Sequence, residues 1–327
     1  MPGVLQPSWV GRRVSVRRVV EREPDGRLRE ADVVGDLAGL DAQTAVIEAR
    51  TGLVEVPLAL VTAARMAEPS TADELALEAV VAEGFRPAET EWLGGWLLRA
   101  NGGFLRRGNS ILPLRQLGLP LEQGLGHARR WYRQRGLPMK FQVPTEARRL
   151  LDAELAERGW PVADLTHVMA ARLDALTAPA DAGIPVELAA TPDEQWLTLY
   201  RGGGGLVEPA RSLLTRHPNV VFASARVDGR TVGVARGTVD VASGGAWLAV
   251  NAVEVHPDHR RSGIGTAVTA ALWQWGREQG AGRTCLTVLA ENDAAVGLYE
   301  RLGYWRHHDY HYRSEPPTEP SAARVGR

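Results

Sequence analysis

The sequence predicts an α+β protein with more than one domain, and three observations support this class. Residues 1–67 are β-rich and carry no long helical pattern. Strand and helix patterns alternate from there to residue 313, in two segments that repeat one another at an offset of about 144 residues. The length of 327 residues also exceeds what one hydrophobic core usually serves.

Residues 1–67 read as about five short strands separated by turn residues, which favours a small β-barrel. The clearest strand runs are residues 14–20, 32–37, 44–48 and 54–57. Pro69 then ends the last strand, and Ser70 or Thr71 can cap the helix that begins near Leu75. A first domain boundary is therefore expected between residues 67 and 70.

Residues 70–176 and 184–313 are expected to form two further domains, joined by a linker rich in Ala, Pro and Gly. The first should contain a strand pair (95–99 and 104–113), helices at 122–135 and 145–158, and strands at 139–143 and 165–173. The second should contain strands at 186–189, 220–227, 232–239, 246–255, 284–289 and 304–313, and helices at 193–200, 209–216, 263–279 and 293–301. Residues 314–327 are rich in Pro and Ser and are expected to be a disordered tail.

The internal repeat is most visible where both segments end. Trp131 corresponds to Trp275, and Gly159-Trp160 corresponds to Gly303-Tyr304. Each copy therefore ends in the order helix, strand, helix, Gly-aromatic, strand, which indicates a duplication.

The composition excludes several classes of protein. A net charge of −1 with 24% charged residues gives no support to a polybasic nucleic-acid or membrane binder. One cysteine, Cys285, excludes a disulfide framework. No apolar stretch reaches 18 residues and no signal-peptide pattern is present, so a cytoplasmic protein is expected. Five of the eight histidines lie between 256 and 311, without the spacing of a metal motif, and no metal site is expected.

The segment 253–266 carries the strongest chemical signal. A strand that ends near Val255 is followed by a short polar turn and then by a helix with its buried stripe at Val268, Leu272 and Trp275. Such a turn presents unpaired main-chain amides at a helix N-terminus, where an anion binds. Gly263 and Gly265 allow a bulky phosphate to approach the backbone.

Two motifs in this region resemble those of the Gcn5-related N-acetyltransferase (GNAT) superfamily. Its pyrophosphate loop, [R/Q]xxGx[G/A], is similar to residues 260–265, and its later NxxAxxxYxxxG[F/Y] element is similar to residues 292–304. The resemblance spans about residues 184–313 and implies a GNAT fold, with a mixed central sheet between helices. The repeat extends this expectation to two tandem copies.

The resemblance also implies roles for particular residues. Backbone groups of Val253 and Val255 would pair with the pantetheine arm of acetyl-CoA, and Asn292 would hydrogen-bond the same arm. Tyr299 would be the general acid for the leaving thiolate; the alternative is that it only packs the core. The pyrophosphate would be held by Arg260, Arg261, Ser262, Gly263, Ile264, Gly265 and Thr266.

The general base is left open. Family positions that often supply it correspond to Ala249, Asn251 and Thr287, none of which can accept a proton at neutral pH. Glu254 and His256 are the nearest titratable groups, and Glu254 is retained as the candidate base if a β-bulge turns its side chain toward the site. A water relay, or an acceptor amine of low pKa, remains the alternative.

The first copy lacks this machinery. At the 144-residue offset, the loop reads Gln116-Leu-Gly-Leu-Pro-Leu121, and Asn292 and Tyr299 become Arg148 and Leu155. Pro120 removes an amide donor, so this copy is expected to be a degenerate GNAT-like domain that packs against or shapes the acceptor site. Residues 10–17 and 54–57 resemble an SH3-like barrel, which matches the fold expected for residues 1–67.

Together these features predict an acyl-CoA-dependent N-acyltransferase that moves acetyl from acetyl-CoA to a primary amine. The amine, on a small molecule or a peptide, would attack directly in a ternary complex. The alternative is a non-catalytic protein that senses acyl-CoA. Neither a membrane nor nucleic acid is expected as a partner, and the chain is expected to be a monomer or a homodimer.

Overall fold

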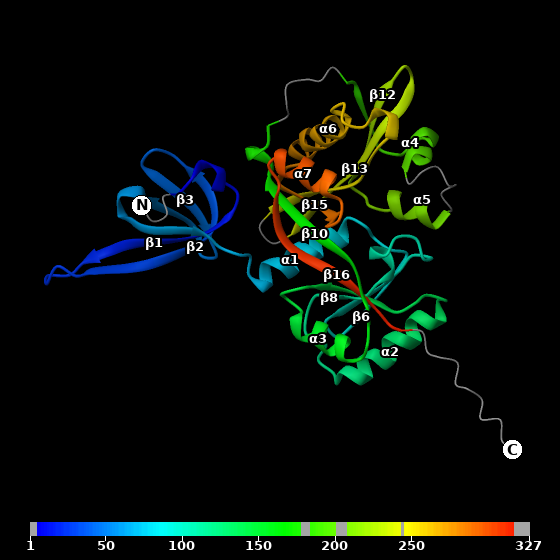
Figure 1. Cartoon of the computed structure of the whole chain (residues 1–327), viewed down its shortest axis with the longest axis horizontal. Coiled ribbons are helices and arrows are strands. Elements are labelled where there is room, and N and C mark those ends of the chain that lie inside the picture. The colour runs from blue at the N-terminus through cyan, green and yellow to red at the C-terminus, as the bar shows by residue number, and fades with distance from the viewer. Residues whose placement is uncertain (1–4, 178–183, 201–207, 243–244, 317–327) are drawn as a thin grey trace.

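The computed structural model describes residues 5–177, 184–200, 208–242 and 245–316 and contains three β-sheets (Figure 1). A five-stranded sheet occupies the N-terminal region. An eight-stranded mixed sheet forms the centre of the remaining chain, and a three-stranded sheet lies beside it. No helix in the described part of the chain is long and apolar enough to cross a membrane.

The N-terminal sheet is antiparallel with the strand order β4-β3-β2-β1-β5. Alternate side chains such as Val14, Val16, Leu37 and Ile47 are fully buried on one face, as a period of two requires. Between the described residues of β4 and β5 there is no hydrogen-bonded ladder, so the structure shows an open sheet and the predicted small β-barrel is not confirmed. Its strands are β1 (Arg13–Arg22), β2 (Leu28–Leu40), β3 (Thr44–Ala49), β4 (Gly52–Pro57) and β5 (Val61–Met66).

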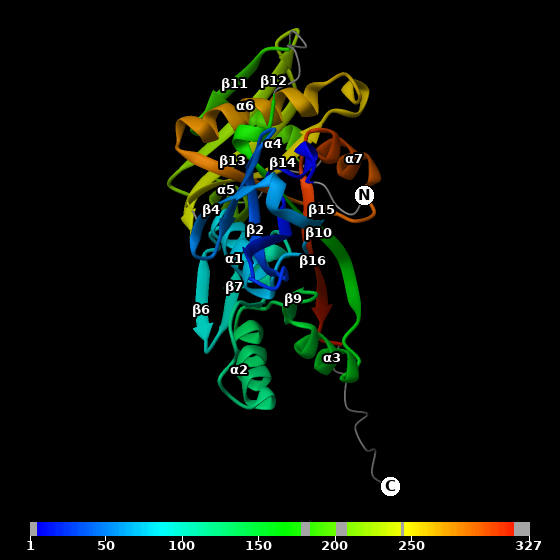
Figure 2. The ribbon, with the colours of Figure 1, turned by 90° about the vertical axis from the view of Figure 1, so that its left-hand side faces the viewer.

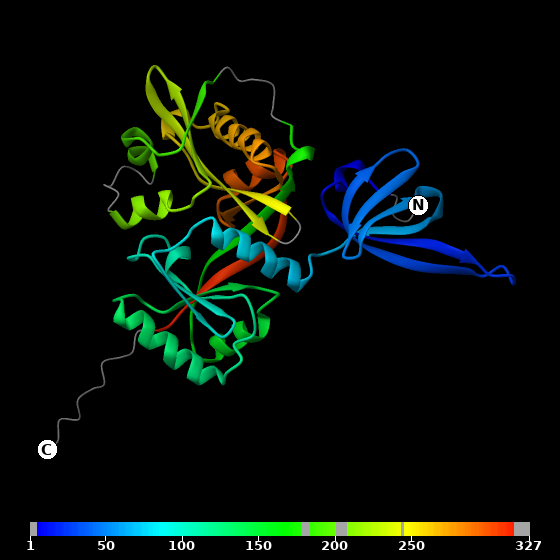
Figure 3. The same cartoon turned by 180° about the vertical axis from the view of Figure 1, so that it is seen from behind.

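The chain passes from this sheet directly into helix α1 (Thr71–Glu83), as Figure 3 shows. Ser70 is the N-cap: its hydroxyl accepts from the amide of Asp73, whose carboxylate accepts from the amide of Ser70. Beyond α1 lie β6 (Glu89–Leu93), β7 (Trp96–Ala100), β8 (Leu112–Pro113), α2 (Leu121–Gln134), β9 (Lys140–Pro144), α3 (Arg149–Glu157) and β10 (Val162–Arg172).

The last part of the chain follows the predicted order of strands and helices. Its elements are β11 (Val186–Ala189), α4 (Glu194–Leu199), α5 (Glu208–Thr215), β12 (Val220–Val227), β13 (Arg230–Ala242), β14 (Gly245–Val255), α6 (Ile264–Glu278), β15 (Ala281–Leu289), α7 (Asp293–Arg301) and β16 (Trp305–Ser314). Glu315 still donates its amide to the carbonyl of Met139. The rest of the predicted tail, residues 317–327, lies outside the described residues.

The central sheet interleaves strands from residues 70–176, the first segment, and residues 184–316, the second segment. Its order is β11-β12-β13-β14-β15-β10-β16-β9, and only the β14–β15 pair is parallel. β10 therefore lies between β15 and β16, and β16 lies between β10 and β9 (Figure 2). The last strand of the first segment, β10, pairs with β15 and β16 of the second, and the last strand of the second segment, β16, pairs with β10 and β9 of the first. The two segments therefore share one sheet.

Helices cover both faces of this sheet. The larger core packs Val268, Leu272 and Trp273 of α6 against one face. The other face packs Leu77 and Val81 of α1 against β10, β14, β15 and β16. The helices α4 and α5 cover the same face further along, over β12 and β13.

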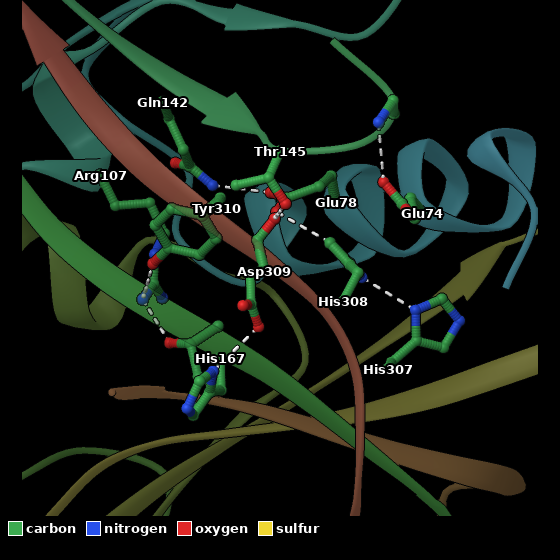
Figure 4. A network of polar contacts seen from close by, with 12 residues as sticks. Glu74, Glu78, Arg107, Gln142, Thr145, His167, His307, His308, Asp309 and Tyr310 are labelled. Atoms are coloured by element: carbon green, nitrogen blue, oxygen red, sulfur yellow. Dashed lines mark hydrogen bonds and ion pairs between the residues drawn. The ribbon is translucent and has the colours of Figure 1, made fainter. Parts of the chain in front are cut away.

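A buried polar network ties α1 to the interleaved strands (Figure 4). The carboxylate of Glu78, which is fully buried, accepts from Nε2 of Gln142 on β9 at 2.6 Å. Its other oxygen lies 3.1 Å from Nε2 of His308 on β16. Because each buried polar group has a partner, the network favours one register of β9 and β16 against α1.

Candidate active site

The two parallel strands at the centre of the large sheet separate toward their carboxyl ends. β14 and β15 pair from Ala246 opposite Ala281 to Val250 opposite Leu286. β14 continues to Val255 and β15 to Leu289, and the edge of β14 that faces β15 is unpaired beyond Val250. A linear ligand can bind to this open edge as an added strand.

A β-bulge lies where the strands separate. Arg236 of β13 faces Asn251, and Val234 faces Glu254, so β14 carries one extra residue over this interval. Ala252 has φ +53°, which is uncommon for a residue with a side chain. The bulge changes the direction of β14 and brings Glu254 to the cavity wall.

The turn after β14 ends at an uncapped helix N-terminus. Gly263, the N-cap of α6, has φ +87°, and no side chain caps the helix. The first amides of α6 have no acceptor one turn earlier in the helix, and the helix dipole adds positive potential there. A helix start of the kind that binds anions is therefore present at the predicted position.

The side chain of Ile264 packs the first turn of α6 against β13. Ile264 is 2% exposed and packs into the core beneath this turn. A Cβ placed on Gly233 of β13 would lie 2.1 Å from Cγ2 of Ile264. The glycine on β13 therefore allows the first turn of α6 to sit close to the sheet.

A groove of about 980 Å³ runs along the starts of α6 and α7. Two of the predicted residues contribute no side chain to it: Ile264 is buried, and the hydroxyl of Ser262 donates to the carbonyl of His259 at 2.6 Å. The predicted site residues that line it are Val253, Glu254, Val255, Arg260, Arg261, Gly263, Gly265, Thr266, Asn292 and Tyr299.

A second cavity of about 700 Å³ adjoins the groove. Both are lined by Val253, Glu254, Asn292, Ala295 and Tyr299, so the two spaces meet at these residues. Two ligands, one in each space, can therefore come together there.

Tyr299 and Asn292 are both held in place by the structure of α7. Tyr299 is 6% exposed and packs edge-on against Tyr304, with ring centroids 5.8 Å apart. Burial raises the pKa of Tyr299 above its ordinary value, so the phenol keeps its proton at neutral pH. Oδ1 of Asn292 accepts from the amide of Ala295 at 3.1 Å and caps α7, which leaves the Asn292 amide NH₂ as its donor.

The candidate bases differ in their surroundings. Glu254 lines both the groove and the second cavity. Nδ1 of His256 accepts from the amide of Asp258 at 3.4 Å and caps the short 3-10 turn Pro257–His259. Of these two groups, Glu254 is the one at the junction.

Residues from the first segment also line the second cavity, and the sequence analysis did not identify them. Phe85 follows α1, and Arg107 lies in a 3-10 turn (Arg107–Asn109) that reaches β15 and β16. Nη2 of Arg107 donates to Oγ1 of Thr287 and to the hydroxyl of Tyr310 (Figure 4). In the sequence, Arg107 lies in a polar, glycine-containing loop after a strand. Such a loop gives no information about which distant residues its side chains contact.

Comparisons with known proteins agree on one family. The family described as "Probable histone acetyltransferase Rv0428c C-terminal" matches residues 71–313. The probable histone acetyltransferase Rv0428c of Mycobacterium tuberculosis (strain ATCC 25618 / H37Rv) is 31% identical over 324 residues, covering 93% of this chain and 96% of that protein. The uncharacterized N-acetyltransferase YobR of Bacillus subtilis (strain 168) is 28% identical over 228 residues, covering 68% and 90%.

Solved structures share the fold. A GCN5-related N-acetyltransferase from Kribbella flavida superimposes with a TM-score of 0.60 at 22% identity, over 77% of this chain and 98% of that chain. A tandem GNAT protein from the clavulanic acid biosynthesis pathway gives a TM-score of 0.52 at 15% identity, over 76% and 94%. The catalytic reading of the sequence is confirmed over that of a non-catalytic sensor: the chain belongs to the GNAT superfamily and, within it, to the Rv0428c-like N-acetyltransferases.

Proposed function

We propose that this protein transfers acetyl from acetyl-CoA to a primary amine by direct attack in a ternary complex. The observation that carries the proposal is the junction of groove and cavity at Glu254 and Tyr299. An acid and a carboxylate meet there beside an open strand edge and a helix N-terminus. No covalent enzyme intermediate is needed, because both reactants can reach the junction.

The residues around the groove fit acetyl-CoA. The unpaired edge of β14 at Val253 and Val255 offers main-chain groups to the pantetheine amides. The amides from Gly263 to Thr266 face the pyrophosphate, with Arg260 and Arg261 beside them. Each charge-assisted hydrogen bond of this kind contributes about 1.5–3 kcal/mol.

In the transfer, the amine nitrogen forms a bond to the acyl carbon and the carbon–sulfur bond breaks. The leaving thiolate takes the phenolic proton of Tyr299, and the amine proton passes to Glu254 or through water to solvent. A lysine-like amine of pKa 10.4 costs about 4.6 kcal/mol to deprotonate at pH 7, so a base near the amine has a large effect.

The remaining parts of the chain receive supporting roles in this proposal. Residues 70–176 are a degenerate GNAT copy that shapes the acceptor cavity of the catalytic copy at 184–313. Two observations support this role. The two segments share the strands of one sheet. The N-cap of α2 is Pro120, which has no amide proton, whereas the N-cap of α6 is Gly263. Residues 1–67 form an SH3-like module, which the strand order and the 3-10 turn before β5 support.

Calorimetry with acetyl-CoA tests the anion site. We expect Gly263→Glu to weaken binding at least about tenfold, because a carboxylate is placed where the pyrophosphate binds and because a side chain is strained at φ +87°. Gly280→Glu is the matched control: it lies at the other end of α6, also at positive φ, with no atom within 4 Å of an added Cβ. Equal affinity in the two variants would contradict the proposed pyrophosphate site.

A further inference from the structure

A guanidinium group from the first segment stands at the wall of the acceptor cavity without an ionic partner. Nη2 of Arg107 contacts two neutral hydroxyls, on Thr287 and Tyr310. Its Nε is buried with no hydrogen-bond partner, and no carboxylate of the described residues forms an ion pair with it. A charged group in such a place is costly unless a ligand completes its surroundings.

The loop that carries Arg107 is held rigidly. Asn109, 6% exposed, donates through Nδ2 to the carbonyls of Phe104 and Leu105 at 2.7 and 2.8 Å. Its Oδ1 accepts from the amides of Asn101 and Gly103 at 2.8 and 3.0 Å. Four bonds to one side chain fix the position from which Arg107 extends, as a recognition residue requires.

A second guanidinium, that of Arg236, lies behind this wall and reaches it only through Asn251, which lines the cavity. Arg236 is fully buried and donates to the carbonyls of Leu214 and Gly84 and to Oδ1 of Asn251, all neutral. Burial lowers the pKa of Arg236 to about 9, and its Nη2 has no partner. The ring of Phe85 contacts both cations, with its centroid 4.9 Å from Cζ of Arg236 and 5.5 Å from Cζ of Arg107.

Besides Arg107, the charged residues of the described chain that line the cavity are Arg106, Asp164 and Glu254, and the buried carboxylate of Glu78, outside this lining, also attracts Arg107. Arg106 forms an ion pair with Asp164, so these two charges offset one another. Glu254 lies at the junction with the acetyl-CoA groove. The cavity therefore carries the carboxylate of Glu254 at its junction with the groove, where the acceptor amine must react, and the guanidinium of Arg107 on another part of its wall.

We propose that the acceptor is a small amine that also carries a carboxylate, and that Arg107 determines this specificity by binding the carboxylate. The inference rests on the proposed acetyl transfer and names its substrate class. The amine lies toward Glu254 and the thioester, and the carboxylate lies against Arg107. A cavity of about 700 Å³ is of the size that holds small ligands.

The first test compares acceptors on the intact chain. Thiol release from acetyl-CoA is measured with α-amino acids, ω-amino acids and dipeptides, each paired with its C-terminal amide. Cys285 is fully buried and does not interfere. We expect kcat/KM to be at least about tenfold higher for the acids, the effect of one charge-assisted hydrogen bond. Amidation makes an α-amine less basic, so intrinsic reactivity opposes this preference. Equal use of acids and amides overturns the proposal.

The second test changes the arginine. Arg107→Gln should raise KM for the carboxylate acceptor at least about tenfold and remove the preference for acid over amide, with the acetyl-CoA dissociation constant unchanged. Arg107→Lys should restore part of the preference. The control is Arg115→Gln, an exposed arginine outside both cavities that stacks on Trp92. An Arg107→Gln enzyme that still prefers acids contradicts the assignment.

Two outcomes separate this inference from the proposed function. If acetyl-CoA binds but no amine of the panel is acetylated, both fail. If amides and acids are acetylated equally, acetyl transfer stands and the role of Arg107 fails. Calorimetry with acetyl-CoA also reveals whether the Arg107→Gln variant folds. If it does not fold, the comparison of acids with amides on the unaltered chain still tests whether the acceptor carries a carboxylate.

Discussion

The position of Tyr299 is compatible with both of the roles that the sequence left as alternatives. It belongs to the main hydrophobic core, and it also lines both cavities. The same burial that packs its ring raises the pKa of its hydroxyl. A core position therefore keeps the proton on the group that is proposed to donate it.

Replacing Tyr299 by Phe should lower kcat by about 10²–10⁴-fold, the usual contribution of a general acid. Affinity for acetyl-CoA, measured by calorimetry, should change little. Tyr304→Phe is the matched control, because the Tyr304 hydroxyl bonds Nε1 of Trp273 at 2.8 Å and Oγ1 of Thr284 at 3.0 Å, outside both cavities. It should cost stability and leave kcat near normal. A Tyr299→Phe enzyme with normal kcat would rule out the acid role.

The burial of His307 on β16 leads us to expect that the free energy of unfolding decreases in acid. Burial and the neighbouring His308 lower the pKa of His307 to about 3. Between pH 6.5 and 3 the unfolded chain binds a proton at this residue that the folded chain does not, so stability is lost as the pH falls. This one group contributes a slope of at most about 1.4 kcal/mol per pH unit. His307→Gln should flatten the pH dependence of the unfolding free energy, measured by urea unfolding from pH 7 to 4, and an unchanged slope would contradict this prediction.

At the scale of elements, the first turn of α6 depends on the strand beneath it. Ile264 packs over Gly233, and the amides that face the groove belong to the same turn. Gly265 also lies close to α7, since an added Cβ would be 3.4 Å from Cδ2 of Leu298. Small residues on two elements therefore set the position of the proposed anion site.

Gly233→Ala should displace this turn. The added methyl overlaps Ile264, so we expect a loss of about 1–3 kcal/mol in unfolding free energy and weaker acetyl-CoA binding. Gly237→Ala on the same strand would contact Leu272 and Leu248 at 3.1–3.2 Å, below the middle of α6. Calorimetry should find near-normal binding in that control. Equal affinity losses in both variants would mean that the helix start has no special dependence on Gly233.

At the scale of the whole molecule, the exchange of last strands makes the two segments one folding unit. Without β10, both β15 and β16 lose a hydrogen-bonded neighbour, and buried residues such as Val168, Met169 and Ala170 leave the core. The N-terminal sheet is attached differently, through ion pairs such as Arg283 with Glu48 at 2.7 Å.

Residues 184–316 produced alone should therefore be insoluble or fail to bind acetyl-CoA. Coproduction with residues 70–176 should restore binding, because the missing strands are then supplied in trans. Copurification and calorimetry measure this. A stable 184–316 fragment with full affinity would show that the interleaved strands are dispensable.

Much of the site was accessible from the sequence because its signals are local. The two glycines after a strand, the helix stripe through Val268 and Leu272, and the Asn292-to-Tyr304 pattern each lie within a few turns of chain. The open N-terminal sheet was not predictable, because closure depends on whether β4 meets β5, and strand runs carry no information on that pairing.

By itself the sequence determined the order of elements, the exposed N-terminus of the helix that is proposed to receive an anion, and the acetyltransferase family. Only the tertiary structure decided that β10 enters the sheet between β15 and β16, and that Arg107 reaches Thr287, 180 positions away along the chain. The physical reason is that a helix start or a strand period is set by neighbouring residues. The partner of a strand edge or of a guanidinium is instead set by the packing of distant segments.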